Sequence, residues 1–368
     1  MSQPTLEQFQ ADALAFLEAN APRKEAEKKF VWGEGADKVA MFEEKDRQSE
    51  KLDVAEACAW RRKKFDAGFG YVFGSEQYGG RGLPVAYSRA YDALEAKYEI
   101  PNQSCFTIGL GMVAPTIVDH GSDIARELYV RKMYRGDIVG CQLFSEPGAG
   151  SDLANLSTKA ERDGDEWIIT GQKVWTSGAH YSDIGEIIAR TDFDMPKHKG
   201  LSYFYIDMKA PGVEIKPIKQ LTGDADFNEV YFTDVRVSDR QRLGEVGQGW
   251  QVALTTLMNE RAAIGGGIGK MDVDFAIAIA QDVELDGQPA INNAAVRTRI
   301  ADWYVQEAGL KYTGYRSLTA LSRGALPGPE NSIGKLVGAP KMQAMASFLM
   351  DLLGASGAIS DEALAVKA

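Results

Sequence analysis

The sequence predicts a multi-domain α+β protein with three parts: an N-terminal helical domain (1–136), a middle β-barrel or β-sandwich domain (137–244) and a C-terminal helical bundle (245–368). Apolar residues recur at helical spacing up to about residue 136 and again from Gly247, whereas between these regions they alternate with a period near two. The chain of 368 residues is also long for one domain. Helices followed by strands and then by helices lack the βαβ alternation of a doubly wound sheet.

The first element is predicted to be an amphipathic helix near the N-terminus. Thr5 and Gln8 have the spacing of a capping box. The segment has no basic start, and acidic residues interrupt its apolar runs, so it is not a signal peptide. No stretch reaches the ~18 apolar residues that a membrane helix needs. We therefore expect a soluble, cytoplasmic protein without a membrane span. The residues expected on the buried face of the helix are Leu6, Phe9, Ala13, Phe16 and Leu17.

The middle region is predicted to form a sheet. Four segments are rich in β-branched and aromatic residues, and Asp163-Gly164 is a turn signal before the first of them. These segments are residues 166–175, 183–192, 200–208 and 227–237.

The C-terminal region returns to helical spacing. Residues 295–324 form a long amphipathic pattern, a Pro/Gly loop follows at 324–332, and a last helix ends at Gly354. The glycine run 265–270 is not a phosphate-binding loop, because the preceding segment is helical and Met271 stands where that motif needs Ser or Thr.

Composition excludes several classes of function. A net charge of −11 and a pI near 5.0 argue against a partner that is a nucleic acid or an anionic membrane. The three cysteines, Cys58, Cys105 and Cys141, are odd in number and widely spaced, so a disulfide framework is not expected. The three histidines and the cysteines have no zinc-site spacing, and we expect no metal.

Two short stretches carry candidate chemistry. In residues 146–152, Glu-Pro-Gly-Ala-Gly-Ser-Asp, glycines allow backbone N–H groups to approach a pyrophosphate closely, and Ser145 and Ser151 add hydroxyls. In residues 171–177, Gly-Gln-Lys-Val-Trp-Thr-Ser, Trp175 offers a flat apolar face. The structural alternative is a glycine-rich hairpin turn and a core tryptophan.

Both stretches, in this order and spacing, resemble the flavin-binding core of the acyl-CoA dehydrogenase family. The resemblance covers about residues 70–265 well. It implies FAD as cofactor, an acyl-CoA substrate, and an electron-transfer flavoprotein as acceptor. It also implies that Ser151 contacts the diphosphate and the substrate. The other residues implied to bind the flavin are Gln142, Phe144, Ser145, Gly150, Trp175, Thr176 and Ser177.

The same resemblance implies a catalytic base. Some family members carry this carboxylate in a C-terminal loop, and others carry it on a helix just before an arginine, as in Glu260-Arg261. Neither Asp361 nor Glu362 lies in a matching loop motif. We therefore expect Glu260 to take the α-proton and Arg261 to support the CoA side of the substrate. The alternative is that Glu260 is a solvated charge or pairs with Arg261.

The chain departs from the family pattern in its last third. Residues 277–289 lack the Arg-x-x-Phe-Gly stretch that contacts FAD across a subunit interface in many homotetramers, and residues 351–355 only weakly match a later glycine motif. Either the chain lacks part of its C-terminus, or it forms a heterotetramer with a homologous subunit instead of a homotetramer. Two other functions stay open, an acyl-CoA oxidase and a non-catalytic partner subunit.

Overall fold

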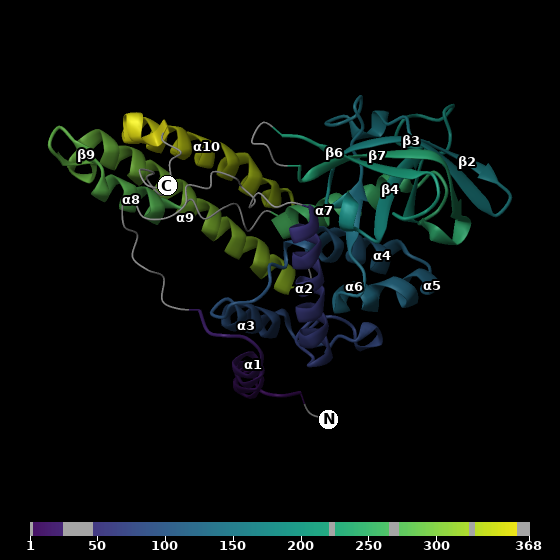
Figure 1. Ribbon diagram of the computed structural model, residues 1–368, viewed down its shortest axis with the longest axis horizontal. Coiled ribbons are helices and arrows are strands. Elements are labelled where there is room, and N and C mark those ends of the chain that lie inside the picture. Colours follow the sequence, from purple (N-terminus) through teal and green to yellow (C-terminus); the bar gives the residue numbers. More distant parts are fainter. Residues whose placement is uncertain (1–2, 25–46, 221–224, 265–271, 324–327, 359–368) are drawn as a thin grey trace. The chain divides into compact units, whose positions relative to one another are not determined.

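The computed structural model describes residues 3–24, 47–220, 225–264, 272–323 and 328–358 (Figure 1). Described residues up to Asn259 form one compact unit, and those from Glu260 onward form a second. The order of elements along the chain is helices, then strands, then helices, which confirms the predicted fold class. Among the described residues, no helix is long and apolar enough to cross a membrane.

The N-terminal helices form the first part of the first unit. Thr5 caps the first helix with the predicted capping box, and Phe9, Ala13 and Leu17 are buried, whereas Leu6 is 39% exposed at the first turn. Two π-helical segments, Gly109–Val113 and Arg126–Val130, interrupt the later helices. The α-helices are α1 (Leu6–Asn20), α2 (Arg47–Asp66), α3 (Val85–Glu95), α4 (Ala114–His120), α5 (Asp123–Ala125) and α6 (Arg131–Arg135).

The middle region is one eight-stranded sheet with the order β6-β7-β3-β2-β4-β5-β8, and β1 pairs in parallel with β4 (Figure 1). The predicted turn is confirmed, because Asp163 pairs with Glu166 across a hairpin in which Gly164 has φ +64°. The strands are β1 (Gly140–Leu143), β2 (Lys159–Asp163), β3 (Glu166–Ser177), β4 (Ile184–Arg190), β5 (Leu201–Asp207), β6 (Val213–Ile218), β7 (Phe227–Ser238) and β8 (Arg242–Leu243).

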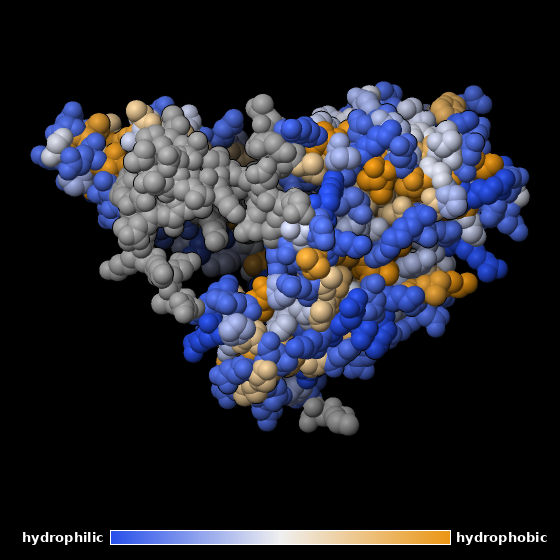
Figure 2. Space-filling view, viewed as in Figure 1, coloured by the Kyte–Doolittle hydropathy of each residue, from blue (hydrophilic) through white to orange (hydrophobic). Residues whose placement is uncertain are grey.

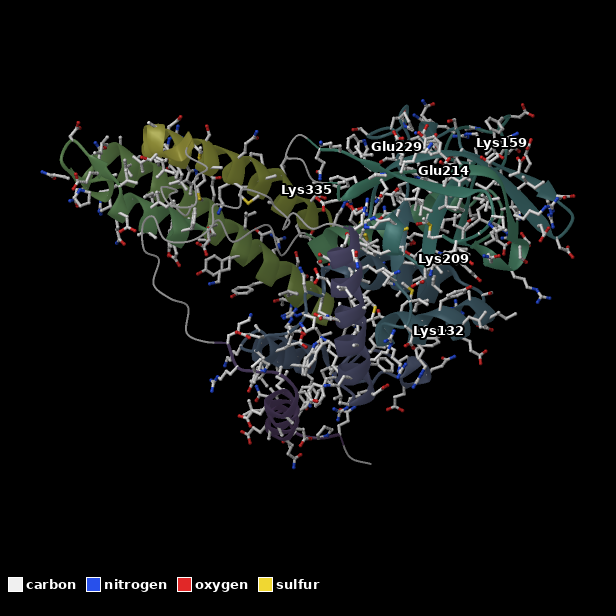
Figure 3. All side chains as sticks on the ribbon, viewed as in Figure 1. Lys132, Lys159, Lys209, Glu214, Glu229 and Lys335 are labelled. Carbon is white, nitrogen blue, oxygen red and sulfur yellow. The ribbon has the colours of Figure 1, made fainter. Side chains whose placement is uncertain are left out.

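Strands β4 and β5 are buried on both faces. On one face, Ile188 and Tyr203 pack with helical residues in a single core cluster, and on the other, Ile187 and Phe204 pack with residues of β3 and β7. This double burial explains why these strands have few polar positions. At the start of β4, Asp183 is held by Lys209 (Figure 3) at 2.6 Å and by the Val139 N–H at 2.9 Å, which ties β4 to the entry of β1.

Helix α7 (Gly249–Ile264) begins in the first unit, and Glu260 is the first residue assigned to the second. The second unit contains α8 (Val273–Asp282), a hairpin of β9 (Glu284–Leu285) and β10 (Gln288–Pro289), α9 (Ala294–Ser322) and α10 (Ile333–Leu353). Its core includes Ile279, Ile300, Trp303, Met345 and Leu349. Apolar residues also reach the largely hydrophilic surface in patches (Figure 2). On α9, four large side chains are each more than half exposed, namely Tyr304, Val305, Tyr312 and Tyr315.

Candidate active site

The first predicted motif forms a tight turn after β1. The backbones of Glu146 and Ala149 exchange hydrogen bonds of 3.0 and 3.1 Å. Gly148 and Gly150 are exposed, and a Cβ added to either would meet no protein atom within 4 Å. Packing within this chain therefore does not require these two glycines, and the space in front of the turn is open to a ligand.

A buried ion pair fixes this turn to β3. Lys173 Nζ lies 2.9 Å from Glu146 Oε1, and Lys173 also donates to the Phe144 carbonyl at 2.9 Å. The Glu146 carboxylate accepts three more hydrogen bonds, from the Ser157 N–H, the Ser157 hydroxyl and the Thr158 N–H. Since both charges are buried and their hydrogen-bonding capacity is used, the pair holds the ends of β1 and β3 side by side.

The charge of Glu146 is fixed at neutral pH. Burial alone would raise the pKa of this carboxyl, but the Lys173 charge and the hydrogen bonds from Thr158 and Ser157 lower its pKa to about 2. A carboxylate that stays ionised and fully hydrogen-bonded is a poor proton acceptor. Glu146 is therefore a structural anchor, a role that sequence reasoning did not assign to it.

The second motif turns a tryptophan outward. Trp175 is 57% exposed, has φ 63°, and contacts the Phe227 ring edge-on at 5.9 Å. The pairing of β3 with β7 shifts register between Lys173 and Thr176, and this irregularity rotates the indole away from the core. The alternative of a core tryptophan is therefore wrong.

Thr176 lies beside this ring with an unusual environment. It is 2% exposed, its carbonyl accepts from Asn228 Nδ2 at 3.0 Å, and its hydroxyl has no hydrogen-bond partner in the described part of the chain. A buried hydroxyl without a partner costs stability unless a ligand supplies one. The neighbouring Ser177 is half-buried.

These features fit a flavin nucleotide. The exposed indole offers a flat face to an aromatic ring, the Thr176 hydroxyl can bond the edge of that ring, and the open glycine turn can approach a diphosphate. Val174 N–H donates to the Ser145 carbonyl at 2.8 Å, so the two motifs are adjacent. Of the remaining predicted flavin residues, Gln142 lies in β1 and is half-buried. Phe144 and Ser145 link β1 to the first motif and are buried and half-buried, and Ser151 lies in that motif and is exposed. In the described ranges, no group of three His, Cys, Asp or Glu side chains could hold a metal ion.

The proposed base lies on α7, where a helix was predicted. Glu260 is half-buried and Arg261 is exposed. Thr256, one turn earlier on the same helix, is fully buried, as is Ala253. The glycine run 265–270 lies outside the described residues.

An open hollow of about 530 Å³ borders the start of α7. The rings of Trp250 and His198 meet edge-on at 4.8 Å, and Lys199 follows His198 in the lining. Aromatic rings beside cationic side chains are the groups that bind a phosphorylated purine. Sequence reasoning missed this hollow, because its lining comes from a loop and a helix end that are 50 residues apart.

Comparison with known proteins gives a consistent result. The family described as "Acyl-CoA dehydrogenase, middle domain" matches residues 141–235, and "Acyl-CoA dehydrogenase, C-terminal domain" matches residues 247–366. The chain is 41% identical over 252 residues to acyl-CoA dehydrogenase FadE34 of Mycobacterium tuberculosis. That alignment covers 68% of this chain but only 34% of the relative, so the chain spans about a third of that protein.

Two further matches span nearly the whole chain. Acyl-CoA dehydrogenase IpdE1 of Mycobacterium tuberculosis is 32% identical over 359 residues, which cover 96% of this chain and 87% of the relative. A solved structure of a variant of the Tcur3481-Tcur3483 steroid ACAD has a TM-score of 0.71 and 27% identity, covering 96% of this chain and 87% of that chain.

Proposed function

The chain belongs to the acyl-CoA dehydrogenase family, and from this premise we propose that Glu260 takes the α-proton of an acyl-CoA substrate during its oxidation to the 2-enoyl-CoA. The chain is an acyl-CoA dehydrogenase, and the cofactor of this family is FAD. The observation that carries the proposal is the pair of adjacent motifs, joined by the Glu146–Lys173 ion pair, that presents Trp175 and the glycine turn.

The cofactor and the two side chains have separate roles in the proposed reaction. FAD, when bound, accepts the β-hydrogen as hydride. The α-proton is only weakly acidic, so the carboxylate that takes it must lie within about 3 Å of it. The half-buried Glu260 suits this role, and Arg261 beside it offers a charge to the CoA side of the substrate.

A base substitution tests the proposal. Purified Glu260→Gln is mixed anaerobically with acyl-CoA, and the visible absorbance of oxidised flavin is followed. We expect the variant to bind FAD as the wild type does while flavin reduction is lost. Glu245→Gln is the control, because Glu245 is an exposed carboxylate that precedes the helix and is not proposed to contact the reacting atoms. Flavin reduction by Glu260→Gln at the wild-type rate would remove Glu260 from the mechanism.

We propose a bulky, steroid-type acyl group as the substrate. Support comes from the solved structure of the steroid ACAD variant, which aligns over nearly the whole chain. A panel of short, branched, long and steroid-side-chain acyl-CoAs tests this, with the fastest flavin reduction expected for the last class.

We also propose that the hollow beside Trp250 takes the nucleotide end of CoA. CoA carries a diphosphate and a ribose phosphate, which need cations, and an adenine, which stacks on aromatic rings. Lys199, His198 and Trp250 supply these groups.

The proposed assembly is a heterotetramer with a homologous subunit, with an electron-transfer flavoprotein as electron acceptor. The two-component Tcur3481-Tcur3483 steroid ACAD, whose structure is similar, supports this, as do the exposed tyrosines on α9. In addition, Val283 and Asp286 stand in the segment where many homotetramers carry Arg-x-x-Phe-Gly, so this chain lacks the arginine and the phenylalanine of that motif. Peroxide formation without an added acceptor would instead indicate an oxidase. A subunit that lacks flavin and activity in every assembly would indicate a non-catalytic partner.

A further inference from the structure

Four buried polar side chains lie close together where α7 packs on the sheet, and three of them form a hydrogen-bonded chain. Thr116 Oγ1 of α4 lies 2.8 Å from Thr256 Oγ1 of α7, and Thr256 Oγ1 lies 3.0 Å from the Tyr203 hydroxyl of β5. The Glu186 carboxyl of β4 lies close enough to Tyr203 to raise the pKa of that phenol. All four side chains are completely buried within the first unit.

This arrangement is not what apolar packing alone would select. Three hydroxyls and a carboxyl lie in a cluster whose neighbours include Ile188, Val252 and Leu243. Burial and the neighbouring Glu186 carboxyl raise the pKa of Tyr203 well above its usual value, so the phenol stays protonated and can donate. Buried polar groups are tolerated only when they bond one another, and such bonds allow few alternative packings.

The bonds hold α7 against β5 at two levels. At the helix start, a Cβ on Gly249 would lie 2.6 Å from the Ser202 carbonyl carbon, and Gly247 N–H donates to Ser202 Oγ at 3.0 Å. Two turns later, Thr256 bonds Tyr203 on the same strand. The first contact limits the distance of the helix from the sheet, and the second limits its rotation about its own axis.

Rotation of α7 would move the proposed base. Glu260 follows Thr256 by four residues, which places the two side chains about 40° apart on one helix face. Thr255 bonds His120 Nε2 at 2.8 Å, but it is about 140° from Glu260 around the helix and is only half-buried. Water can replace the Thr255 bond, whereas it cannot reach Thr256.

We propose that Thr256, held by Tyr203 and Thr116, is a positioning residue for Glu260, because these buried hydrogen bonds set the rotation of α7. The inference rests on the proposed role of Glu260. It concerns geometry alone, since none of the four residues is required to touch the substrate.

The test compares Thr256→Val and Tyr203→Phe with the wild type. Each variant keeps the shape of its side chain and removes one hydroxyl. At saturating acyl-CoA we expect flavin reduction to slow by about 10- to 100-fold, the effect of a misplaced base. FAD content and the KM for acyl-CoA should stay within about twofold, since less than 0.5 kcal/mol of binding energy is at stake. Thr256→Ser restores the hydroxyl and should recover most of the rate.

Two controls separate positioning from stability. Thr255→Val removes a neighbouring helix hydroxyl and should leave the reduction rate near the wild-type value. The double variant Thr256→Val/Tyr203→Phe should be no slower than the slower single variant, since both break one chain. If Thr256→Val fails to fold, Tyr203→Phe carries the same test.

Wild-type reduction rates in Thr256→Val and Tyr203→Phe, together with lowered melting temperatures, would show that the chain is structural only and would overturn the inference. Glu260→Gln is measured in parallel. If that variant keeps its activity, the proposed base fails; if it is inactive while the hydroxyl variants are unimpaired, only the positioning inference fails.

Discussion

At the scale of single residues, Glu146 and Lys173 matter because they are charged and almost inaccessible to water. An isolated buried charge is strongly destabilising, whereas a paired and hydrogen-bonded one is tolerated. The two lie 27 positions apart, and only the fold brings them together. Glu146 and Lys173 each lie in one of the two sequence motifs, but the spacing of residues along the sequence could not predict that the two side chains form an ion pair.

We predict that Glu146→Gln lowers the free energy of unfolding by about 3 kcal/mol or more, because Lys173 is left buried without a counter-charge. Adding Lys173→Met should recover much of this loss, since both charges are then gone. Urea denaturation of the flavin-free proteins measures both effects. Glu166→Gln, which affects an exposed pair with Arg236, serves as control and should leave the midpoint nearly unchanged. A Glu146→Gln midpoint as high as the wild type would contradict the anchoring role.

A single charged residue, Lys199, also decides a prediction about binding, because it lines the hollow beside Trp250. We predict that Lys199→Glu raises the KM for acyl-CoA roughly 10-fold, equivalent to about 1.4 kcal/mol of binding energy. The KM for the matching acyl-pantetheine, which lacks the nucleotide, should not change. Equal effects on the two substrates would show that the hollow does not take the nucleotide end.

At the scale of elements, the turn at residues 146–150 and the end of β3 form the candidate flavin site. The glycines and hydroxyls of this region were predicted from the sequence because residue type alone carries their chemistry. The outward direction of Trp175 was not predictable, since it depends on a positive φ and on a register shift against β7. Glu186 gave a weak signal, as the one carboxylate within the otherwise apolar run 184–189, but the three buried hydroxyls grouped with it come from three other elements.

The turn itself can be tested. We predict that Gly148→Val weakens FAD binding at least 10-fold while the melting temperature of the flavin-free protein changes little. A Cβ at this position would meet no protein atom within 4 Å, so the substitution is expected to obstruct a ligand and not the fold. Fluorescence titration of the flavin-free protein with FAD measures the affinity. Unchanged affinity would place the diphosphate elsewhere.

At the scale of the whole molecule, the order of helices and strands followed from periodicity alone, because helical and strand spacings differ clearly. The predicted domain limits stay predictions. The choice between a homotetramer and a heterotetramer could not be predicted from the sequence. The exposed tyrosines of α9 could pack against either a copy of this chain or a homologous subunit.

We predict that co-expression with a homologous acyl-CoA dehydrogenase subunit yields a complex of four chains with more bound FAD per chain than this chain has alone. Light scattering gives the mass, and the visible spectrum gives the flavin content. Tyr312→Glu, which places a charge on the exposed face of α9, should weaken the complex. A stable monomer that binds FAD tightly and is indifferent to the partner would contradict this assembly.

The central claim is that this chain oxidises acyl-CoA thioesters, and one anaerobic titration tests it most directly. The purified flavoprotein, with its partner subunit if required for flavin binding, is titrated with each acyl-CoA of the panel. The account predicts that at least one substrate, most readily a steroid-side-chain thioester, bleaches the flavin and yields an equivalent amount of the 2-enoyl-CoA. A fully loaded flavoprotein that stays oxidised with every member of the panel, and forms no enoyl product, would contradict it.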